Sequence, residues 1–426
     1  MYVAVIEPIL TYGSEVWGAS ITKVHIKRKL LSAQRLALIS ITKAYKTAPT
    51  DALLATANLV PIDLIITEKF WSHQQRRLAN QTIRQQHYIN TMGNMVDSTV
   101  LNNISDHINR FELDHNQRQV FYHPTFSLDE HFNMDDPEVS TDFRVYTDGS
   151  KSEDGVGCAM VVMNKSTNIY QASYKLANHC TANQAESLAI YRALHWIHNN
   201  YTYYNIKTIT IYSDSRVALL QLKNMNNKHN IVRNSITLLT NIRNTTINFS
   251  WVRGHSGVPG NERADLLART AHTWCHNTSY DLIPPTWLKN NIRDYTWKVW
   301  QERWETSHTG RITYGFIPNV RKRSKYKHFI TNHSITQLIS GHGNFRSYLR
   351  RFLQKTDGRC QCNLNEDEDP THIIWNCPLY CNERRQLIET VQSNNDLWPC
   401  QSYALIENSK YYKALKGFAT AIKILD

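Results

Sequence analysis

Two stretches, 143-FRVYTDGS-150 and 251-WVRGHSGVPGNERADLLARTA-271, decide how the chain folds. The first has the aromatic and β-branched residues of a strand and ends in a turn signal. The second passes from a strand through a glycine-rich loop into a helix that begins at Pro259. Between them, 181-TANQAE-186 begins a helix and 211-IYSDS-215 ends a strand. Each stretch therefore carries a carboxylate near the end of a strand or the beginning of a helix.

The sequence around these stretches alternates between strand and helix patterns. Strands are predicted at 143–148, 155–163, 169–174, 207–213 and 247–252. Helices are predicted at 182–199, 215–224, 231–243 and from 259 onward. Thr181 and Gln184 form the capping-box pattern at the beginning of the first helix. This order of elements predicts an α/β domain with a mixed sheet and flanking helices.

The four carboxylates in these stretches are Asp148, Glu186, Asp214 and Asp265. Each is predicted at the margin of a buried surface, where an unpaired carboxylate is costly unless a cation lies beside it. Hydrolysis of a phosphodiester needs an activated water and a stabilised leaving oxygen, and two divalent ions can provide both. Mg²⁺ prefers oxygen ligands of this kind. We therefore predict that the four side chains form one metal-binding cluster that cuts nucleic acid.

The motifs TDGS, TANQAE, SDS and WVRGHSGVPGNERAD, in this order, resemble the type-1 ribonuclease H family. The resemblance covers residues 141–275, less than a third of the chain. It implies a five-stranded mixed sheet and a site for two Mg²⁺ ions, or Mn²⁺ in their place, held by the four carboxylates. It also implies endonucleolytic cleavage of the RNA strand of an RNA–DNA hybrid, leaving 5′-phosphate and 3′-hydroxyl ends.

The same resemblance points to further site residues. His255, in a loop bounded by glycines, matches the family's flexible-loop histidine, which implies proton transfer or product release. Gly149, Ser150 and Asn183 are candidates for contacts to the hybrid, where 2′-hydroxyls distinguish RNA from DNA. Thr181 is either a phosphate contact or a helix cap, and the sequence favours neither.

Two positions depart from the family pattern. Cellular members commonly have Asn where this chain has Ala182 and Gln where it has Arg216. The insert between the two short helices also lacks the Trp- and Lys-rich segment of bacterial members. These departures put contacts to the strands in doubt, and the basic segment downstream is expected to contribute to the grip on the hybrid.

Near the C-terminus, a second cluster has the spacing C-x-C, nine residues, then H-x₄-C, formed by Cys360, Cys362, His372 and Cys377. Three thiolates and an imidazole satisfy tetrahedral Zn²⁺, so a structural zinc site is predicted here. The arrangement resembles the CCHC knuckle of non-LTR retrotransposon polyproteins. The alternatives are unligated cysteines, or Cys381 in place of Cys377.

Composition narrows the class of protein. The chain has 426 residues, a formal charge of +12 and a pI near 9.2. The excess of positive charge favours nucleic-acid partners. The alternative is that it only keeps the protein soluble. Its eight cysteines are too sparse for a disulfide scaffold, and no apolar run is long enough to span a membrane. Cytoplasm or nucleus is therefore the expected compartment.

The flanking segments are assigned as follows: 1–85 helical, 86–140 a polar and acidic linker, 276–356 a basic helical connector, 357–400 the zinc knuckle and 401–426 a terminal helix. Residues 1–85 resemble the segment after the polymerase palm in non-LTR reverse transcriptases. No paired-carboxylate palm strand is found, since Met134-Asp135-Asp136 lacks the tyrosine and apolar flanks, so any polymerase would be separate. The linker is a solvated spacer or a shield for the basic surface.

The prediction is thus a ribonuclease H within a piece of a retrotransposon polyprotein. Single-stranded RNA is a further expected partner through the basic and zinc regions, unless the tryptophans there serve only core packing. Two alternatives stay open: an inactive nucleic-acid-binding protein and a structure-specific nuclease of the same fold.

Overall fold

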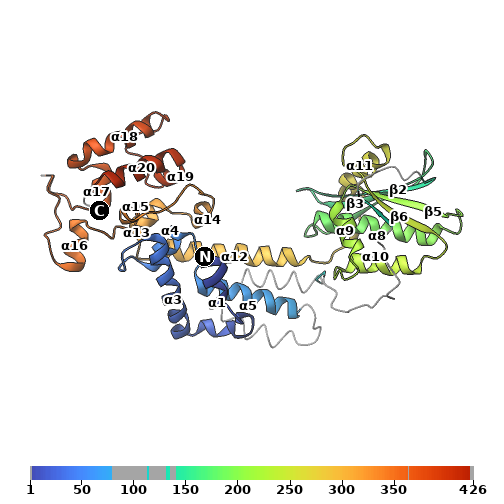
Figure 1. Ribbon diagram of the computed structural model, residues 1–426, viewed down its shortest axis with the longest axis horizontal. Helices are drawn as coiled ribbons and strands as arrows, with labels where there is room; N and C mark the ends of the chain where they lie inside the picture. The colour runs from blue at the N-terminus through green and yellow to red at the C-terminus, as the bar shows by residue number, and fades with distance from the viewer. Residues whose placement is uncertain (1, 79–112, 115–130, 135–140, 363, 423–426) are drawn as a thin grey trace. The chain divides into compact units, whose positions relative to one another are not determined.

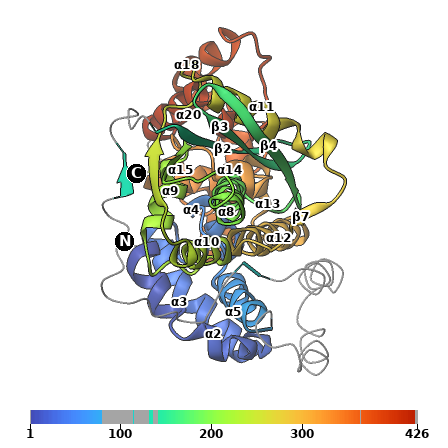
Figure 2. The ribbon, with the colours of Figure 1, turned by 90° about the vertical axis from the view of Figure 1, so that its right-hand side faces the viewer.

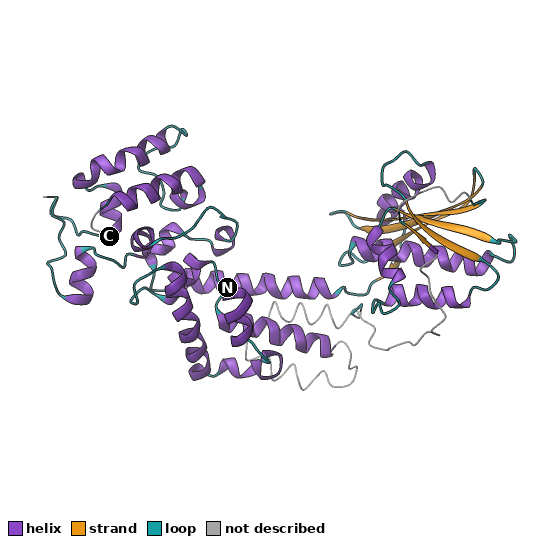
Figure 3. Ribbon diagram, in the orientation of Figure 1, coloured by secondary structure: helices purple, strands orange, loops and turns teal. Residues whose placement is uncertain are grey.

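The computed structural model describes residues 2–78, 113–114, 131–134, 141–362 and 364–422. The chain divides into two compact units, Met1–Gln74 with Ile292–Asp426, and Gln75–Asn291. Helices make up the described part of the first unit, whereas the strands gather in the second (Figure 3). Each unit has its own hydrophobic core and is described by itself.

The second unit is built on a seven-stranded sheet with the order β1-β6-β5-β2-β3-β4-β7 (Figure 1). Its strands are β1 (Phe132–Asn133), β2 (Phe143–Lys151), β3 (Val156–Asn164), β4 (Thr167–Leu176), β5 (Thr208–Ser213), β6 (Thr246–Trp251) and β7 (Thr278–Tyr280). The pairs β2·β3 and β3·β4 are antiparallel, and the other pairs are parallel. The predicted mixed sheet is therefore confirmed.

The number of strands differs from the expected five, because two short strands extend the sheet at its edges. β1 has two residues and β7 has three, too few to show an alternating pattern in the sequence. Phe132 holds β1 in place by stacking on Phe249 of β6, with ring centroids 4.7 Å apart. β7 follows the last helix of the unit and pairs with the end of β4.

Helices cover both faces of this sheet. They are α8 (Ala182–Asn200), α9 (Arg216–Lys223), α10 (Asn230–Asn241) and α11 (Pro259–Trp274). α11 packs on β2, β3 and β4, while α8 packs on the opposite face with α10 against it (Figures 1 and 2). A large apolar core fills the α8 side, and a smaller core around Tyr146, Tyr212 and Ala264 lies under α11. β3, between these layers, is buried along most of its length.

Local signals in the sequence account for the ends of these elements. The predicted turn at 164–166 joins β3 and β4, with Asn164 opposite Thr167 and Lys165 at a φ of 53°. The capping box at the beginning of α8 is present: Thr181 accepts from the Gln184 amide, and the Gln184 side chain accepts from the Thr181 amide. These bonds satisfy amides that the helix itself leaves free.

The first unit consists of short helices. They are η1 (Tyr2–Ile6), α1 (Glu7–Leu10), α2 (Ser14–Trp17), η2 (Gly18–Thr22), α3 (Val24–Thr42), α4 (Thr50–Ala57), α5 (Ile62–Leu78), α12 (Pro285–Thr306), α13 (Arg311–Phe316), α14 (Val320–Arg323), α15 (His333–Ser340), α16 (Arg346–Leu353), α17 (Pro370–Trp375), η4 (Pro378–Tyr380), α18 (Cys381–Gln392), α19 (Ala404–Glu407) and α20 (Ser409–Ala421). Of these, α5 and α12 continue past the boundary of the unit.

One core joins the N-terminal and C-terminal helices of this unit. Leu38 and Leu54 pack in it with Trp300, Trp304 and Leu415, all of them almost fully buried. Trp304 also donates from Nε1 to the Ile317 carbonyl at 2.7 Å. Trp300 and Trp304 of α12 therefore serve core packing, which is one of the two alternatives for the tryptophans of this region. The segment boundaries given above remain predictions.

Among the described residues no single helix is long and apolar enough to cross a membrane, although the bent pair Thr50–Ala57 and Ile62–Gln74 passes by length and composition. Most of the predicted linker, including Asp135 and Asp136, lies outside the described residues. Two of its described pieces belong to the second unit: Leu113 pairs with Ile283, and residues 132–133 form β1.

Candidate active site

Three of the four predicted carboxylates converge at one edge of the sheet. Oxygens of Asp148, Glu186 and Asp214 all lie within 4.8 Å of one another. The register explains the first and last, because Thr147 of β2 pairs in parallel with Ser213 of β5, and each aspartate follows directly. Glu186 lies in the second turn of α8, which packs against β2.

The glycine after Asp148 permits this close packing. A Cβ atom on Gly149 would lie 2.3 Å from the backbone nitrogen of Glu186, far inside van der Waals contact. Gly254 has a similar place, because a Cβ there would lie 2.9 Å from Oδ2 of Asp214. Both glycines allow backbone to approach the carboxylates where a side chain would push them apart.

The electrostatics of the cluster fit a cation. Burial, together with the charges of Asp214 and Asp265, raises the pKa of Asp148 to about 7. Burial and the same neighbours also raise the pKa of Glu186, and burial raises that of Asp214. Oε2 of Glu186 is buried and has no hydrogen-bond partner among the described residues. Oxygen donors crowded in this way match the ligand preference of Mg²⁺ or Mn²⁺.

Asp265, the fourth predicted carboxylate, lies in α11 and belongs to an adjoining group with His255 and Glu262. Its charge still contributes to the raised pKa values of Asp148, Glu186 and Asp214, so the two groups are neighbours. Arg269, one turn further along α11, forms an ion pair with Asp265 at 2.9 Å.

Glu262 was not among the predicted site residues. It precedes Asp265 by three positions, and residues three apart share one face of a helix, so the GNERAD motif contained the signal. Oε1 of Glu262 accepts a hydrogen bond from the Gly257 amide at 3.3 Å, which links the loop to α11.

His255 lies in the loop between β6 and α11. Its backbone has a φ of 53°, and its side chain is 79% exposed. Nδ1 lies 3.9 Å from Oδ2 of Asp265, so the imidazole is beside the carboxylates without being fixed by them. An exposed imidazole with little packing is free to approach and leave the site.

The predicted substrate contacts lie around the same edge. Ser150 is in β2 opposite Gly157, directly after Gly149. Thr181 caps α8, and its hydroxyl oxygen accepts a hydrogen bond from the Gln184 amide. Asn183 donates from Nδ2 to Gln221 at 2.9 Å, whereas its Oδ1 is buried with no partner among the described residues.

Of the two departures from the family pattern, Ala182 is exposed at the beginning of α8. Arg216 lies over the ring of Trp251, with its guanidinium carbon 5.0 Å from the centroid. Its positive charge is thus held near the end of β6 by a cation–π contact.

A buried aspartate outside the predicted domain supports the helix that carries Glu186. Asp114 is almost fully buried; Oδ2 accepts from Gln184 Nε2 at 2.7 Å, and Oδ1 accepts from the Asn230 amide at 3.1 Å. His229 lies 3.9 Å from Oδ2. Burial raises the pKa of Asp114, but the interaction with His229 and the hydrogen bonds from Gln184 and Asn230 outweigh it and hold the pKa below its usual value.

The cysteine cluster in the first unit is also assembled. Ligand atoms of Cys360, Cys362, His372 and Cys377 all lie within 4.8 Å of one another, and all four residues are buried. Sγ of Cys360 lies 3.6 Å from Sγ of Cys377, and Sγ of Cys362 lies 3.3 Å from Nε2 of His372. Tetrahedral zinc with bonds of about 2.3 Å separates its sulfurs by roughly 3.7 Å, so this buried group suggests zinc.

The surroundings orient these ligands. Nδ1 of His372 lies 2.5 Å from Oε2 of Glu366, which leaves Nε2 directed to the cysteines. A carboxylate behind a ligating histidine is the usual support for such a site. Asp369 caps α17, which carries His372, and Cys381 is exposed outside the group.

Comparison with known proteins identifies the second unit's domain. Residues 140–273 match the RNase H family model. The chain is 27% identical over 93 residues to the "Retrovirus-related Pol polyprotein from type-1 retrotransposable element R1 2" of Nasonia vitripennis, covering 22% of each protein. It is 29% identical over 138 residues to the R1 Pol polyprotein of Popillia japonica, covering 32% of this chain and 53% of that protein.

These stretches leave most of the relatives unmatched: the chain spans about a fifth to a third of the first two Nasonia polyproteins. Among solved structures, LC11-RNase H1 in complex with RNA/DNA hybrid is 20% identical and covers 31% of this chain and 96% of its own, with a TM-score of 0.26. RNase H1 from Halobacterium salinarum NRC-1 is 22% identical and covers 30% and 96%, with a TM-score of 0.24. Residues 140–273 are therefore an RNase H domain related to the Pol polyproteins of R1 non-LTR retrotransposons, in a chain that also carries a Cys3His group in its C-terminal region.

Proposed function

We propose that this RNase H domain cleaves the RNA strand of an RNA–DNA hybrid, as a divalent-metal-dependent endonuclease that leaves 5′-phosphate ends. The observation that carries the proposal is the convergence of Asp148, Glu186 and Asp214 within 4.8 Å, with a Glu186 oxygen buried and unpartnered among the described residues. Such a cluster destabilises the fold by itself, because like charges at this distance repel and buried carboxylates lose hydration. A bound cation would offset both costs.

Asp148, Glu186, Asp214 and Asp265 would hold the cations. Bound there, two Mg²⁺ ions would supply a nucleophilic water at neutral pH and stabilise the charge on the leaving oxygen. The chain's own part is to fix the carboxylate positions. Parallel pairing of β2 with β5 places Asp148 and Asp214, which directly follow the last pair, and Gly149 lets α8 bring Glu186 to them. Rigid strands and helices hold such groups more accurately than loops do.

His255 is proposed to move a proton at its imidazole nitrogens during cleavage or product release. It lies 3.9 Å from Asp265, on a loop that leaves it largely exposed. An imidazole can accept and donate a proton during catalysis. The position of His255 depends on its loop. This loop passes close to Asp214, and Gly254 allows the approach because it has no side chain.

Selection of a hybrid is proposed to involve groups beside the carboxylates. The candidate polar groups are the backbone at Gly149 and Ser150 and the side chain of Asn183, whose Oδ1 has no partner among the described residues but must become exposed to reach a substrate. An acceptor such as Oδ1 can take a hydrogen bond from a ribose 2′-hydroxyl, which DNA lacks. Thr181 is proposed to act mainly through the cap that orients α8.

The Cys3His group is proposed to bind one structural Zn²⁺ through Cys360, Cys362, His372 and Cys377. Its burial and the Glu366 contact to His372 favour a closed site without an open coordination position. Zinc there would hold residues 357–400 together and would take no part in cleavage by the RNase H domain.

The test is cleavage of three labelled duplexes of one sequence, a hybrid, a DNA duplex and an RNA duplex, each with Mg²⁺ and the chain. Products from the hybrid's RNA strand alone support the proposal. Binding of the hybrid without cleavage would support an inactive binding protein, and cleavage of DNA would support a structure-specific nuclease. The matched control is Asp154→Asn, an exposed carboxylate in the β2–β3 hairpin, which should cleave like the wild type.

A further inference from the structure

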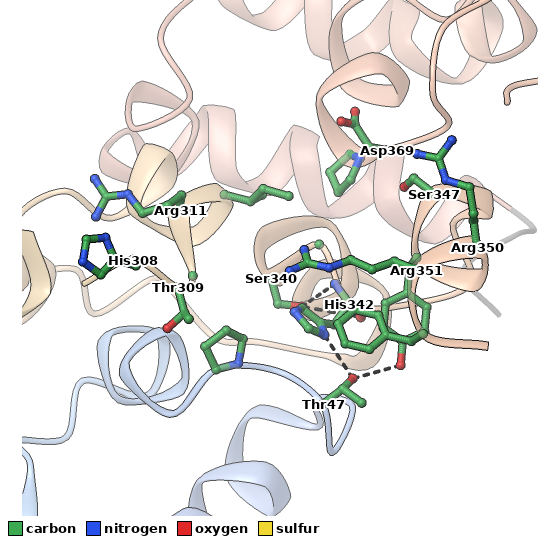
Figure 4. A pocket seen from close by; sticks show the side chains of 17 residues that line it. Thr47, His308, Thr309, Arg311, Ser340, His342, Ser347, Arg350, Arg351 and Asp369 are labelled. Carbon is green, nitrogen blue, oxygen red and sulfur yellow. Dashed lines mark hydrogen bonds between the residues drawn. The ribbon is translucent and has the colours of Figure 1, made fainter. Parts of the chain in front are cut away.

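A second candidate site lies in the first unit, in a pocket of about 620 Å³. Its walls come from the loop before α4, the beginning of α13, the end of α15 and the helix α16 (Figure 4). The sequence around it is basic, with fourteen Lys and Arg against three Asp and Glu between residues 287 and 355. The proposed nuclease activity makes no use of this pocket.

The charged side chains that line the pocket are mainly cationic. Three of its residues are arginines, Arg311, Arg350 and Arg351, and one, Asp369, is a carboxylate. Oδ1 of Asp369 is engaged, because it accepts the hydrogen bond that caps α17. An anion entering the pocket would therefore meet a positive potential.

The three arginines differ in the hydrogen bonds and ion pairs that they make within the protein. Arg311 donates to three backbone carbonyls at the end of α12, and Arg350 donates to both carboxylate oxygens of Asp367. Arg351 has no hydrogen bond or ion pair to any residue in the described part of the chain. Its side chain extends across the pocket above His342 (Figure 4). Its guanidinium is thus available to a ligand, and a guanidinium matches a phosphate in charge and geometry.

His342 lies beside Arg351 and is affected by its positive charge. Burial lowers the pKa of His342 to about 4, and the charges of Arg351 and Arg35 add to the effect. The imidazole is therefore neutral at physiological pH, and its Nδ1 lies 3.0 Å from Oγ1 of Thr47. The positive charge that a ligand meets here stays on Arg351 rather than on the histidine.

Aromatic rings lie beside the guanidinium of Arg351, and Phe352 makes a cation–π contact with it. Phe352 contacts Tyr348, with centroids 4.8 Å apart, and His342 at 5.2 Å, yet 40% of Phe352 remains exposed. The guanidinium carbon of Arg351 lies 5.3 Å from the Phe352 centroid. An exposed ring on an aromatic support, next to a guanidinium that has no hydrogen bond or ion pair in the described part of the chain, can take a nucleobase and its phosphate at the same time.

The helix that carries these residues is fixed to the cysteine cluster's loop. Oγ of Ser347 donates to the Glu368 carbonyl at 2.7 Å, and the Arg346 amide donates to the Glu368 carboxylate at 3.1 Å. Arg350 adds its pair with Asp367. α16 therefore presents Arg351 and Phe352 from a braced position, which lowers the entropy cost of binding.

We propose that this pocket binds single-stranded nucleic acid, with a backbone phosphate on Arg351 and a base on Phe352. Phosphate and base face are common to RNA and DNA, so both single strands are expected to bind. A duplex would bind less well, because its bases are stacked on one another and cannot reach Phe352.

The experiment measures fluorescence anisotropy of a labelled single strand, as RNA and as DNA, with the full chain carrying Asp148→Asn so that cleavage does not interfere. Arg351→Glu and Phe352→Ala should each weaken binding about tenfold. Arg351→Glu should also lower the slope of log affinity against log salt by roughly 0.7, the value for one phosphate contact on a single strand. Phe352→Ala should leave that slope unchanged, because it removes stacking and no charge.

The control is Lys413→Glu, the same reversal of charge at an exposed position of α20 outside the pocket. It should change the affinity less than twofold. Circular dichroism checks the fold of each variant, and Arg351→Gln replaces Arg351→Glu if the latter does not fold. Equal losses from Lys413→Glu and Arg351→Glu, or wild-type affinity in both pocket variants, would overturn the proposal, as would equal sensitivity of a duplex to Phe352→Ala.

Discussion

A Cβ atom on Gly149 would lie 2.3 Å from the backbone nitrogen of Glu186. The absent side chain lets β2 touch the beginning of α8, and this contact brings Asp148 beside Glu186. The Gly149 amide also donates to both carboxylates, which offsets part of the rise that burial causes in their pKa values. One glycine thus sets the spacing of two carboxylates and stabilises their charged form.

Gly149→Ala adds only one methyl group, but it is expected to lower both the stability of the fold and the rate of cleavage. The added methyl group must push α8 from β2, which costs about 1–3 kcal/mol of stability and moves Glu186. Displacement by about 1 Å can lower a rate roughly a hundredfold. Thermal unfolding and hybrid cleavage measure the two effects. The control is Gly417→Ala in α20, where a Cβ meets nothing within 4 Å; wild-type cleavage by Gly149→Ala would contradict the account.

The crowded carboxylates should cost stability when no divalent cation is bound. Glu186→Gln removes one negative charge from the group, and it should raise the melting temperature at pH 8 in metal-free buffer by about 3 °C. Added Mg²⁺ should then stabilise the wild type more than the variant, because binding favours the folded state that holds the ligands. A lower melting temperature for Glu186→Gln, with an undiminished response to Mg²⁺, would speak against a cation site.

His255→Ala tests whether the exposed loop imidazole assists cleavage. The turnover number should fall roughly a hundredfold, as for the loss of a group that transfers a proton. The affinity for hybrid and the melting temperature should hardly change, because the side chain is 79% exposed and packs against little. Steady-state kinetics separate these quantities. An unchanged turnover number would remove His255 from the mechanism.

Cys377→Ser should abolish zinc binding, because it removes one of four ligands that lie within 4.8 Å of one another. Hydrogen exchange should then increase across residues 357–400, while hybrid cleavage by the RNase H domain persists. The matched control is Cys381→Ser, which changes an exposed cysteine outside the group and should retain one zinc per chain. Metal analysis in which neither protein contains zinc would rule out this assignment.

Asp114→Ala should destabilise the second unit by on the order of 2 kcal/mol, since it orphans buried donors of Gln184 and Asn230. The loss should be larger at pH 6 than at pH 8. Asp114 raises the pKa of His229, and a raised pKa stabilises the fold below the unfolded value of 6.5 and ceases to do so as pH rises through the folded value. Thermal unfolding at both pH values, with Asp154→Asn as control, checks this; an equal loss at both would exclude a contribution from His229.

The carboxylates could be predicted because their positions follow from local signals. Asp148 lies in β2 directly after its last pair with β5, Asp214 follows β5, and Glu186 follows a capping box, so each lies close to a short motif. Likewise, Cys360 and Cys377 belong to a recognisable spacing. Residues such as these are fixed by the few positions on either side of them.

Other features depend on partners far along the chain. Asp114 lies 70 residues before Gln184, inside a segment whose composition predicts a linker, and nothing near it in the sequence indicates burial. Leu38 and Leu415 share a core although separate segments carry them, which no local pattern reveals. The pocket around Arg351 is likewise assembled from segments far apart in the sequence.

The most direct test of the central claim is single-turnover cleavage of a labelled RNA–DNA hybrid by the wild type and by Asp148→Asn, each with Mg²⁺ and each with hybrid affinity measured in parallel. The account predicts cuts in the RNA strand by the wild type, cleavage slowed at least about a thousandfold in the variant, and affinities that agree within a few-fold. Cleavage by Asp148→Asn at the wild-type rate would contradict it.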